Sequence, residues 1–98
     1  MEKNNVPQQE TIIQLLTVLF PNAKIYLFGS RARGTHTERS DIDIALDLGR
    51  KMEFEEIGRA RGVLEGLNIA QKIDIVDLNR ASDVMREFIF KEGILWKK

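Results

Sequence analysis

Residues 24–48 read KIYLFGSRARGTHTERSDIDIALDL, and this stretch holds two β-prone segments on either side of a polar, basic loop. The first segment, 24–28, is short and apolar, which predicts a strand. The second, 41–48, alternates charged or small residues with aliphatic ones, which predicts a strand with one apolar face. Gly49 follows and ends it. Residues 29–40 are glycine-punctuated and are expected to be mainly loop, with at most a short helical turn.

Helices and one further strand are expected on both sides of this stretch. Apolar residues recur at helical spacing over 7–20 and 53–67, and again from Ser82 to about residue 91. Ser82 is a good N-cap for the last helix. Residues 72–78 (KIDIVDL) alternate as a strand does. The order helix, strand, strand, helix, strand, helix indicates an α/β (α+β) fold, a small mixed β-sheet with helices packed on it.

Three smaller features carry expectations of their own. Gly58 and Gly62 lie four residues apart on the second predicted helix, which favours close packing of that helix against the sheet. Residues 94–96 form a short apolar tail that is expected to close the core. Asp77 shares the parity of the apolar positions in its strand, so a capping or turn role is expected for it.

Composition limits the class of protein. The chain of 98 residues has the length of one domain, so residues 1–98 are predicted to form a single domain without a separate substrate domain. Its formal net charge is +0, which argues against direct nucleic-acid binding. It contains no cysteine, which excludes thiolate metal sites. No apolar run is long enough to span a membrane, and we expect a cytoplasmic protein. The oligomeric state is left open.

Three aspartates form the predicted metal site. Asp41 and Asp43 are two residues apart in a strand, so they project from the same face. Two carboxylates held this close repel each other unless a cation lies between them. Asp74 projects away from the apolar side of its strand and reaches the same place if the two strands are neighbours. Such oxygen ligands suit Mg²⁺, or alternatively Mn²⁺.

The segment before the aspartate pair is predicted to bind phosphate. Gly29 lets the backbone approach a ligand closely, and Ser30 adds a hydroxyl and exposed amides. Arg31 and Arg33 carry guanidinium groups whose geometry matches phosphate. Ser40 is a candidate for the same site, with turn capping as the alternative. An anion cradle beside a metal site suits a nucleoside triphosphate, with attack at either the α- or the γ-phosphorus.

The pattern Gly29-Ser30, ten residues, Asp41-x-Asp43 resembles the DNA polymerase β-like nucleotidyltransferase superfamily. In its short bacterial and archaeal branch the segments commonly read G-S-x-A-R-G and S-D-I-D, and this chain has GSRARG and SDID. The chain is similar to the minimal nucleotidyltransferases that pair with HEPN-domain proteins in toxin–antitoxin modules. Two motifs at the right spacing and a third aspartate in a strand make the resemblance specific.

The resemblance implies a function and a role for each site residue. Asp41 and Asp43 would ligate the catalytic metals, and Asp74 would help to position a metal and activate the attacking hydroxyl. Gly29 and Ser30 would hold the β- and γ-phosphates. The chain would act as an antitoxin that transfers AMP from ATP to a tyrosine of a HEPN-domain toxin encoded nearby.

Two alternatives stay open at this point. One is a nucleotidyltransferase that modifies a small molecule such as an antibiotic, although such proteins usually carry an additional helical domain. The other is a non-catalytic nucleotide-binding module that neutralises its partner by contact alone. The presence of all three motif aspartates argues against the second alternative.

Overall fold

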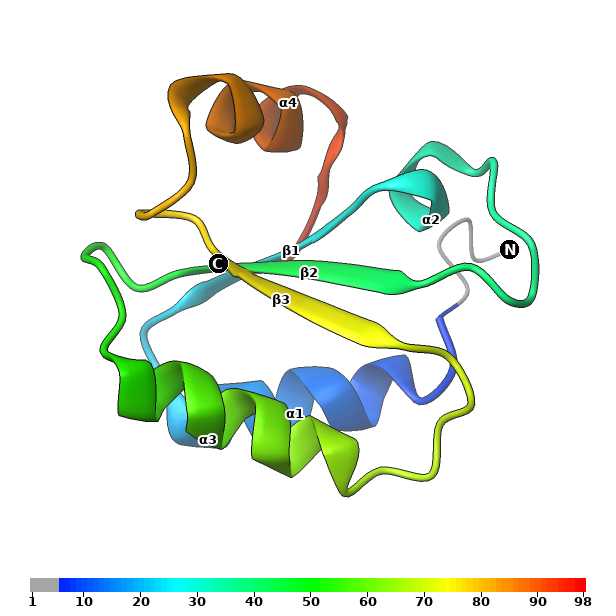
Figure 1. Cartoon of the computed structure of the whole chain (residues 1–98), viewed down its shortest axis with the longest axis horizontal. Coiled ribbons are helices and arrows are strands. Elements are labelled where there is room, and N and C mark those ends of the chain that lie inside the picture. The colour runs from blue at the N-terminus through cyan, green and yellow to red at the C-terminus, as the bar shows by residue number, and fades with distance from the viewer. Residues whose placement is uncertain (1–5) are drawn as a thin grey trace.

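The computed structural model describes residues 6–98. Within them, four strands form one sheet in the order β3-β2-β1-β4 (Figure 1). β1 is antiparallel to both β2 and β4, whereas β2 and β3 are parallel, so the predicted mixed sheet is confirmed. The strand bounds are Lys24–Phe28 for β1, Ile42–Asp47 for β2, Ile73–Asp77 for β3 and Ile94–Lys97 for β4.

Helices cover both faces of this sheet. Figure 1 shows α1 and α3 side by side on one face, α4 on the other, and the single turn of α2 at one end of the sheet. The three long helices match the predicted ones to within two residues at each end. Their bounds are Gln9–Leu19 for α1, Ser30–Arg33 for α2, Phe54–Glu65 for α3 and Asp83–Glu92 for α4. None of the helices in the described residues could span a membrane.

Alternation along β2 divides the core in two. Ile42, Ile44 and Leu46 are fully buried and pack toward α1 and α3. Ala45 is also fully buried, but it belongs to a smaller cluster with Phe28 and with Ile89 of α4. Asp43 has the parity of Ala45, so its carboxylate lies on the α4 side of the sheet. The period-two pattern therefore decides which face carries the predicted site.

The apolar tail forms a strand that the sequence did not reveal. β4 pairs with the outer edge of β1, with Leu27 opposite Ile94 and Tyr26 opposite Leu95. Ile94 packs against the core as expected, whereas Leu95 is 43% exposed. A four-residue segment is too short for alternation to distinguish a strand from an irregular tail.

The expected close packing of Gly58 and Gly62 is wrong. Both residues lie on the exposed face of α3, and a Cβ atom added to either meets no atom within 4 Å. The helix packs on the sheet through Ala60 and Leu64 instead.

Gly93 has the crowded environment that Gly58 lacks, and the two positions make a matched test. A Cβ at Gly93 would lie 2.4 Å from the Ile89 carbonyl oxygen and 3.2 Å from that of Leu27. We expect Gly93→Ala to lower the free energy of unfolding by about 1–3 kcal/mol. Gly58→Ala should instead raise it by up to about 1 kcal/mol, because alanine favours the helix and has room. Urea unfolding of both variants measures the two effects, and equal changes would contradict this difference in packing.

The start of α3 predicts a dependence of stability on pH. The Glu56 side chain accepts hydrogen bonds from Arg50 and from the Glu53 amide, and these interactions lower the pKa of Glu56 from 4.5 to about 2. A carboxylate whose pKa is lower in the folded state stabilises the fold above pH 4.5 and loses that effect as the pH falls toward 2. We expect Glu56→Gln to lower the Tm at pH 7 by a few degrees and to flatten its decline below pH 5, whereas Glu55→Gln should do neither.

Candidate active site

Gly29 and Asp43 are in direct contact at the junction of β1 and α2. Gly29 has φ +79° and joins the end of β1 to the start of α2. A Cβ atom at this position would lie 2.3 Å from Oδ2 of Asp43, so only glycine leaves room for the carboxylate. The predicted phosphate cradle and the predicted metal ligand are therefore adjacent in space as well as in sequence.

Parallel pairing brings a second carboxylate beside Asp43. In the register of β2 and β3, Asp43 lies opposite Asp74, at the strand spacing of about 4.8 Å. Asp41 immediately precedes β2 and is exposed. Burial raises the pKa of Asp43 above its ordinary value, and the charges of Asp74 and Asp41 raise it further. The charge of Arg33 opposes this shift, but the balance leaves a carboxylate whose negative charge is disfavoured.

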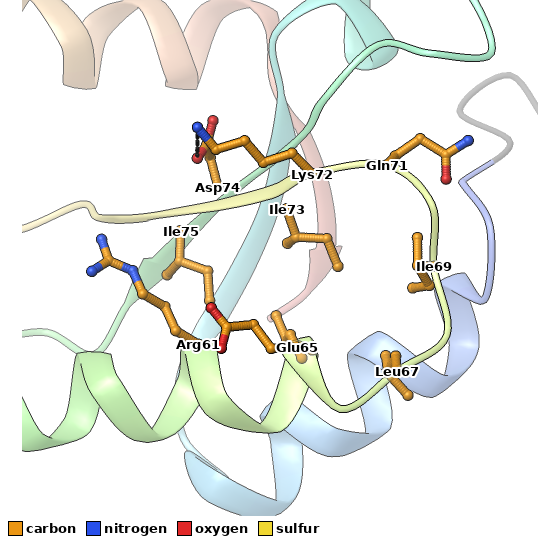
Figure 2. A pocket seen from close by; sticks show the side chains of 10 residues that line it. Arg61, Glu65, Leu67, Ile69, Gln71, Lys72, Ile73, Asp74 and Ile75 are labelled. Atoms are coloured by element: carbon orange, nitrogen blue, oxygen red, sulfur yellow. Dashed lines mark ion pairs between the residues drawn. The ribbon is translucent and has the colours of Figure 1, made fainter.

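The three aspartates do not converge completely in this structure. Within residues 6–98, no three carboxylate, imidazole or thiol side chains are gathered closely enough to hold a metal ion. Asp74 is instead turned toward Lys72, with Oδ1 3.6 Å from Nζ, as Figure 2 shows. Both side chains are substantially exposed, 71% for Lys72 and 42% for Asp74, so the ion pair is weak. The donor chemistry and the mutual repulsion of the aspartates nevertheless fit a divalent cation.

Lys72 is a charged neighbour of the site that the sequence reasoning missed. It lies two residues before Asp74, and its charge also opposes the raised pKa of Asp43. The strand alternation that placed Asp74 on this face should have placed Lys72 there too.

The two arginines of the GSRARG segment have different surroundings. Arg31 is only 3% exposed, and its guanidinium donates to the carbonyl oxygens of Thr37, Glu38 and Ser40. This environment favours a role in holding the loop at 37–40 over the expected contact with phosphate. Arg33 is 41% exposed in its side chain, lies 3.7 Å from Glu92 and stacks on the Phe88 ring at 5.9 Å. It therefore remains the better candidate for contact with phosphate.

The two candidate serines also differ. The Ser40 hydroxyl accepts a hydrogen bond from the Thr37 amide at 2.9 Å, which is the turn-capping alternative. The Ser30 hydroxyl makes no hydrogen bond within the described part of the chain, so it is available to a ligand. Asp77 is buried and accepts from the Met52 and Asn79 amides, which confirms its expected capping role.

Alanine substitutions should separate the two arginines. We expect Arg31→Ala to lower the free energy of unfolding by about 2–4 kcal/mol, because a buried side chain and its part-buried hydrogen bonds to three loop carbonyls are lost. Arg33→Ala should cost less than about 1 kcal/mol, because its ion pair is exposed, but it should weaken binding of a triphosphate. Urea unfolding and titration with a non-hydrolysable ATP analogue measure the two effects. The reverse pattern would assign phosphate contact to Arg31.

Comparison with known proteins finds a matching family. A family model described as "Polymerase beta, Nucleotidyltransferase" matches residues 10–97. The chain is 33% identical over 90 residues to the protein adenylyltransferase MntA of Shewanella oneidensis, covering 87% of this chain. It spans only 61% of the length of that relative.

Solved structures give the same result. A toxin–antitoxin crystal structure with AMP-PNP is similar with a TM-score of 0.78 and 31% identity, over 93% of this chain and 74% of that one. A second similar structure holds the tri-AMPylated HEPN toxin of Shewanella oneidensis in complex with its MNT antitoxin. Its TM-score is 0.63 at 28% identity, over 92% of this chain and 70% of that one. The chain therefore belongs to the polymerase beta nucleotidyltransferase family.

Proposed function

We propose that this chain transfers AMP from ATP to a hydroxyl group of a partner protein, in a reaction that depends on a divalent metal. The observation that carries the proposal is the contact of Gly29 with Asp43, beside Asp74 on the neighbouring strand. A glycine cradle in contact with paired carboxylates suits a triphosphate that chelates a divalent cation.

Asp41, Asp43 and Asp74 would hold the metal, which is Mg²⁺ or, as the alternative, Mn²⁺. When bound, it would neutralise charge on the polyphosphate and stabilise the leaving group. The raised pKa of Asp43 supports this assignment, because a cation would relieve the repulsion that causes part of the shift. Rotation of Asp74 away from Lys72 would complete the ligand set and would cost little, since their ion pair is exposed.

Gly29, Ser30 and Arg33 would bind the nucleotide, and Asp74 would accept the proton of the attacking hydroxyl. Gly29 and Ser30 would hold the β- and γ-phosphates, and Arg33 would neutralise part of their charge. The acceptor hydroxyl oxygen forms a bond to the α-phosphorus, and the bond from that phosphorus to the bridging oxygen of the β-phosphate breaks. Pyrophosphate leaves, and the hydroxyl proton passes to the Asp74 carboxylate and then to water.

The partner that we propose is a HEPN-domain toxin, which this chain would neutralise as an antitoxin. Support comes from the similar solved structures, one of which holds a tri-AMPylated HEPN toxin with its MNT antitoxin. The name of the Shewanella oneidensis relative, protein adenylyltransferase, supports the same reaction.

Labelled ATP tests this function directly. The chain is incubated with Mg²⁺, ATP labelled on its α-phosphate and the product of the neighbouring reading frame, which we predict to be a HEPN-domain protein. Label should enter that protein with the native chain and not with the Asp41→Ala, Asp43→Ala double variant. In a parallel incubation in which an aminoglycoside antibiotic replaces the partner protein, label on the antibiotic would favour antibiotic modification. Equal neutralisation of the partner by the double variant would favour a binding module without catalysis.

A further inference from the structure

The outer edge of β3 has backbone groups without partners. β3 ends the sheet, with β2 on its inner side. The Lys72 carbonyl accepts from Ile42, and the Leu78 amide donates to Leu46, so the even-numbered residues direct their backbone groups toward β2. Backbone groups alternate along a parallel strand, so the amides and carbonyls of Ile73 and Ile75 point outward. Within residues 6–98, no other strand lies along this edge.

A pocket of about 500 Å³ lies along the same edge, between β3 and α3. Figure 2 shows Ile73 and Ile75 pointing from β3 toward α3, with Arg61 and Glu65 rising from α3 on the opposite side. The lining of this pocket is mixed, with charges of both signs beside apolar side chains. The apolar lining residues are Leu64, Leu67, Ile69, Ile73 and Ile75.

The pocket and the proposed active site share one residue, Asp74. Asp74 lines the pocket, and it is also the residue opposite Asp43 on β2. In Figure 2, Asp74 points to the opposite side of β3 from Ile73 and Ile75. One strand therefore presents the Asp74 carboxylate on one face, two isoleucines that line a pocket on the other, and outward backbone groups between them.

We propose that an extended segment of the protein acceptor pairs with the outer edge of β3 as a fifth strand of the sheet. This docking mode rests on the proposed transfer to a protein hydroxyl. Alternate side chains of an added strand point to opposite faces. Apolar residues on one face would fill the pocket, and the hydroxyl-bearing residue between them would lie beside Asp74, about 4.8 Å away across the strands. Backbone hydrogen bonds to β3 would provide affinity. The pocket would select acceptor segments in which apolar residues alternate with the hydroxyl-bearing residue.

The structure favours an acceptor segment over other occupants of this edge. The sheet has a second free edge at β4, but the carboxylate that would take the hydroxyl proton lies on β3. A segment paired with the β3 edge therefore lies next to Asp74. The alternating apolar and hydroxyl-bearing residues that this geometry requires define the acceptor by its chemistry.

A synthetic peptide provides the probe. We would use a capped heptapeptide with tyrosine at its centre, valine on both sides of the tyrosine, and threonine alternating with valine beyond. The control is the same peptide with N-methyl groups on the amides that would pair with β3. With Mg²⁺ and a non-hydrolysable ATP analogue, the first peptide should slow hydrogen exchange of the Ile73 and Ile75 amides about tenfold or more, and the methylated one should not.

Two variants test whether docking at the β3 edge contributes to transfer onto the peptide. Ile73→Pro removes one outward amide and leaves the ladder to β2 intact, because that amide does not face β2. We expect the KM for the peptide to rise about tenfold, with kcat and the affinity for the ATP analogue unchanged within about twofold. Ile69→Glu, which puts charge among the apolar residues that line the pocket, should have the same effect if the proline variant does not fold. Leu95→Glu on β4 is the matched control and should change neither constant.

The outcomes separate this inference from the proposed function. Slower exchange at Ile73 and Ile75 without label transfer to peptide or partner would support docking and contradict the proposed transfer. Label transfer with unchanged exchange, and with an unchanged KM in both variants, would overturn docking and leave the transfer intact. Slower exchange that depends on protein concentration without peptide would show that a second copy occupies the edge, which also overturns the proposal.

Discussion

Replacing Asp43 by asparagine is expected to lower the rate of nucleotide transfer by about 10³-fold or more, because a metal ligand contributes several kcal/mol to transition-state stabilisation. Asp43 lies against Gly29 and opposite Asp74, so no neighbouring carboxylate can take its place without moving the backbone. Single-turnover transfer from labelled ATP measures the loss. Asp47→Asn is the matched control, because Asp47 has the same strand parity but lies two pleats away, and its rate should stay within about twofold.

The same variant should be more stable than the native chain when no metal is present. Burial and the charges of Asp74 and Asp41 raise the pKa of Asp43, so above that pKa the ionised carboxylate destabilises the fold. Asparagine removes this unfavourable charge at pH 7, and the Tm should rise. Mg²⁺ with an ATP analogue should raise the Tm of the native chain by mass action, and that increase should be lost in the variant. A variant that retained more than a tenth of the native rate would contradict the assigned role.

Replacing Gly29 by alanine should have the second largest effect, with transfer reduced about 100-fold or more. The new methyl carbon would lie 2.3 Å from Oδ2 of Asp43, so the carboxylate or the end of β1 must move. Gly29 has φ +79° and ψ −159°, a backbone region confined essentially to glycine, which adds a cost of about 1–3 kcal/mol for any residue with a Cβ. Transfer and urea unfolding are measured on the same preparation.

Gly34→Ala separates the two contributions. Gly34 also has a positive φ, +81° with ψ 14°, but it lies in the left-handed region and a Cβ there meets nothing within 4 Å, so this variant carries a smaller backbone cost and no steric contact. It should lose stability by about 1–2 kcal/mol and keep most of its transfer activity. Equal losses of activity in the two variants would mean that loop strain, and not contact with Asp43, explains the effect at Gly29.

Local patterns predicted the elements, and long-range packing explains what those patterns missed. The limits of β1 follow from four apolar or aromatic residues between Lys24 and a glycine. β4 escaped prediction because it is held by pairing with β1, from the other end of the chain. Gly58 and Gly62 suggested close packing, yet their helix presents them to solvent. A glycine pattern indicates that close approach is sterically allowed, but not that a neighbour is present.

In the candidate site, too, local patterns determined some features and long-range packing determined others. The sequence by itself determined that Asp43 faces away from the aliphatic core and that Gly29 precedes a polar loop, because strand alternation and glycine geometry act over two or three residues. Only the tertiary structure decided that Asp74 lies opposite Asp43 and that Arg31 is buried. These contacts join segments brought together by burial of the whole core, and no local pattern encodes the energy of that packing.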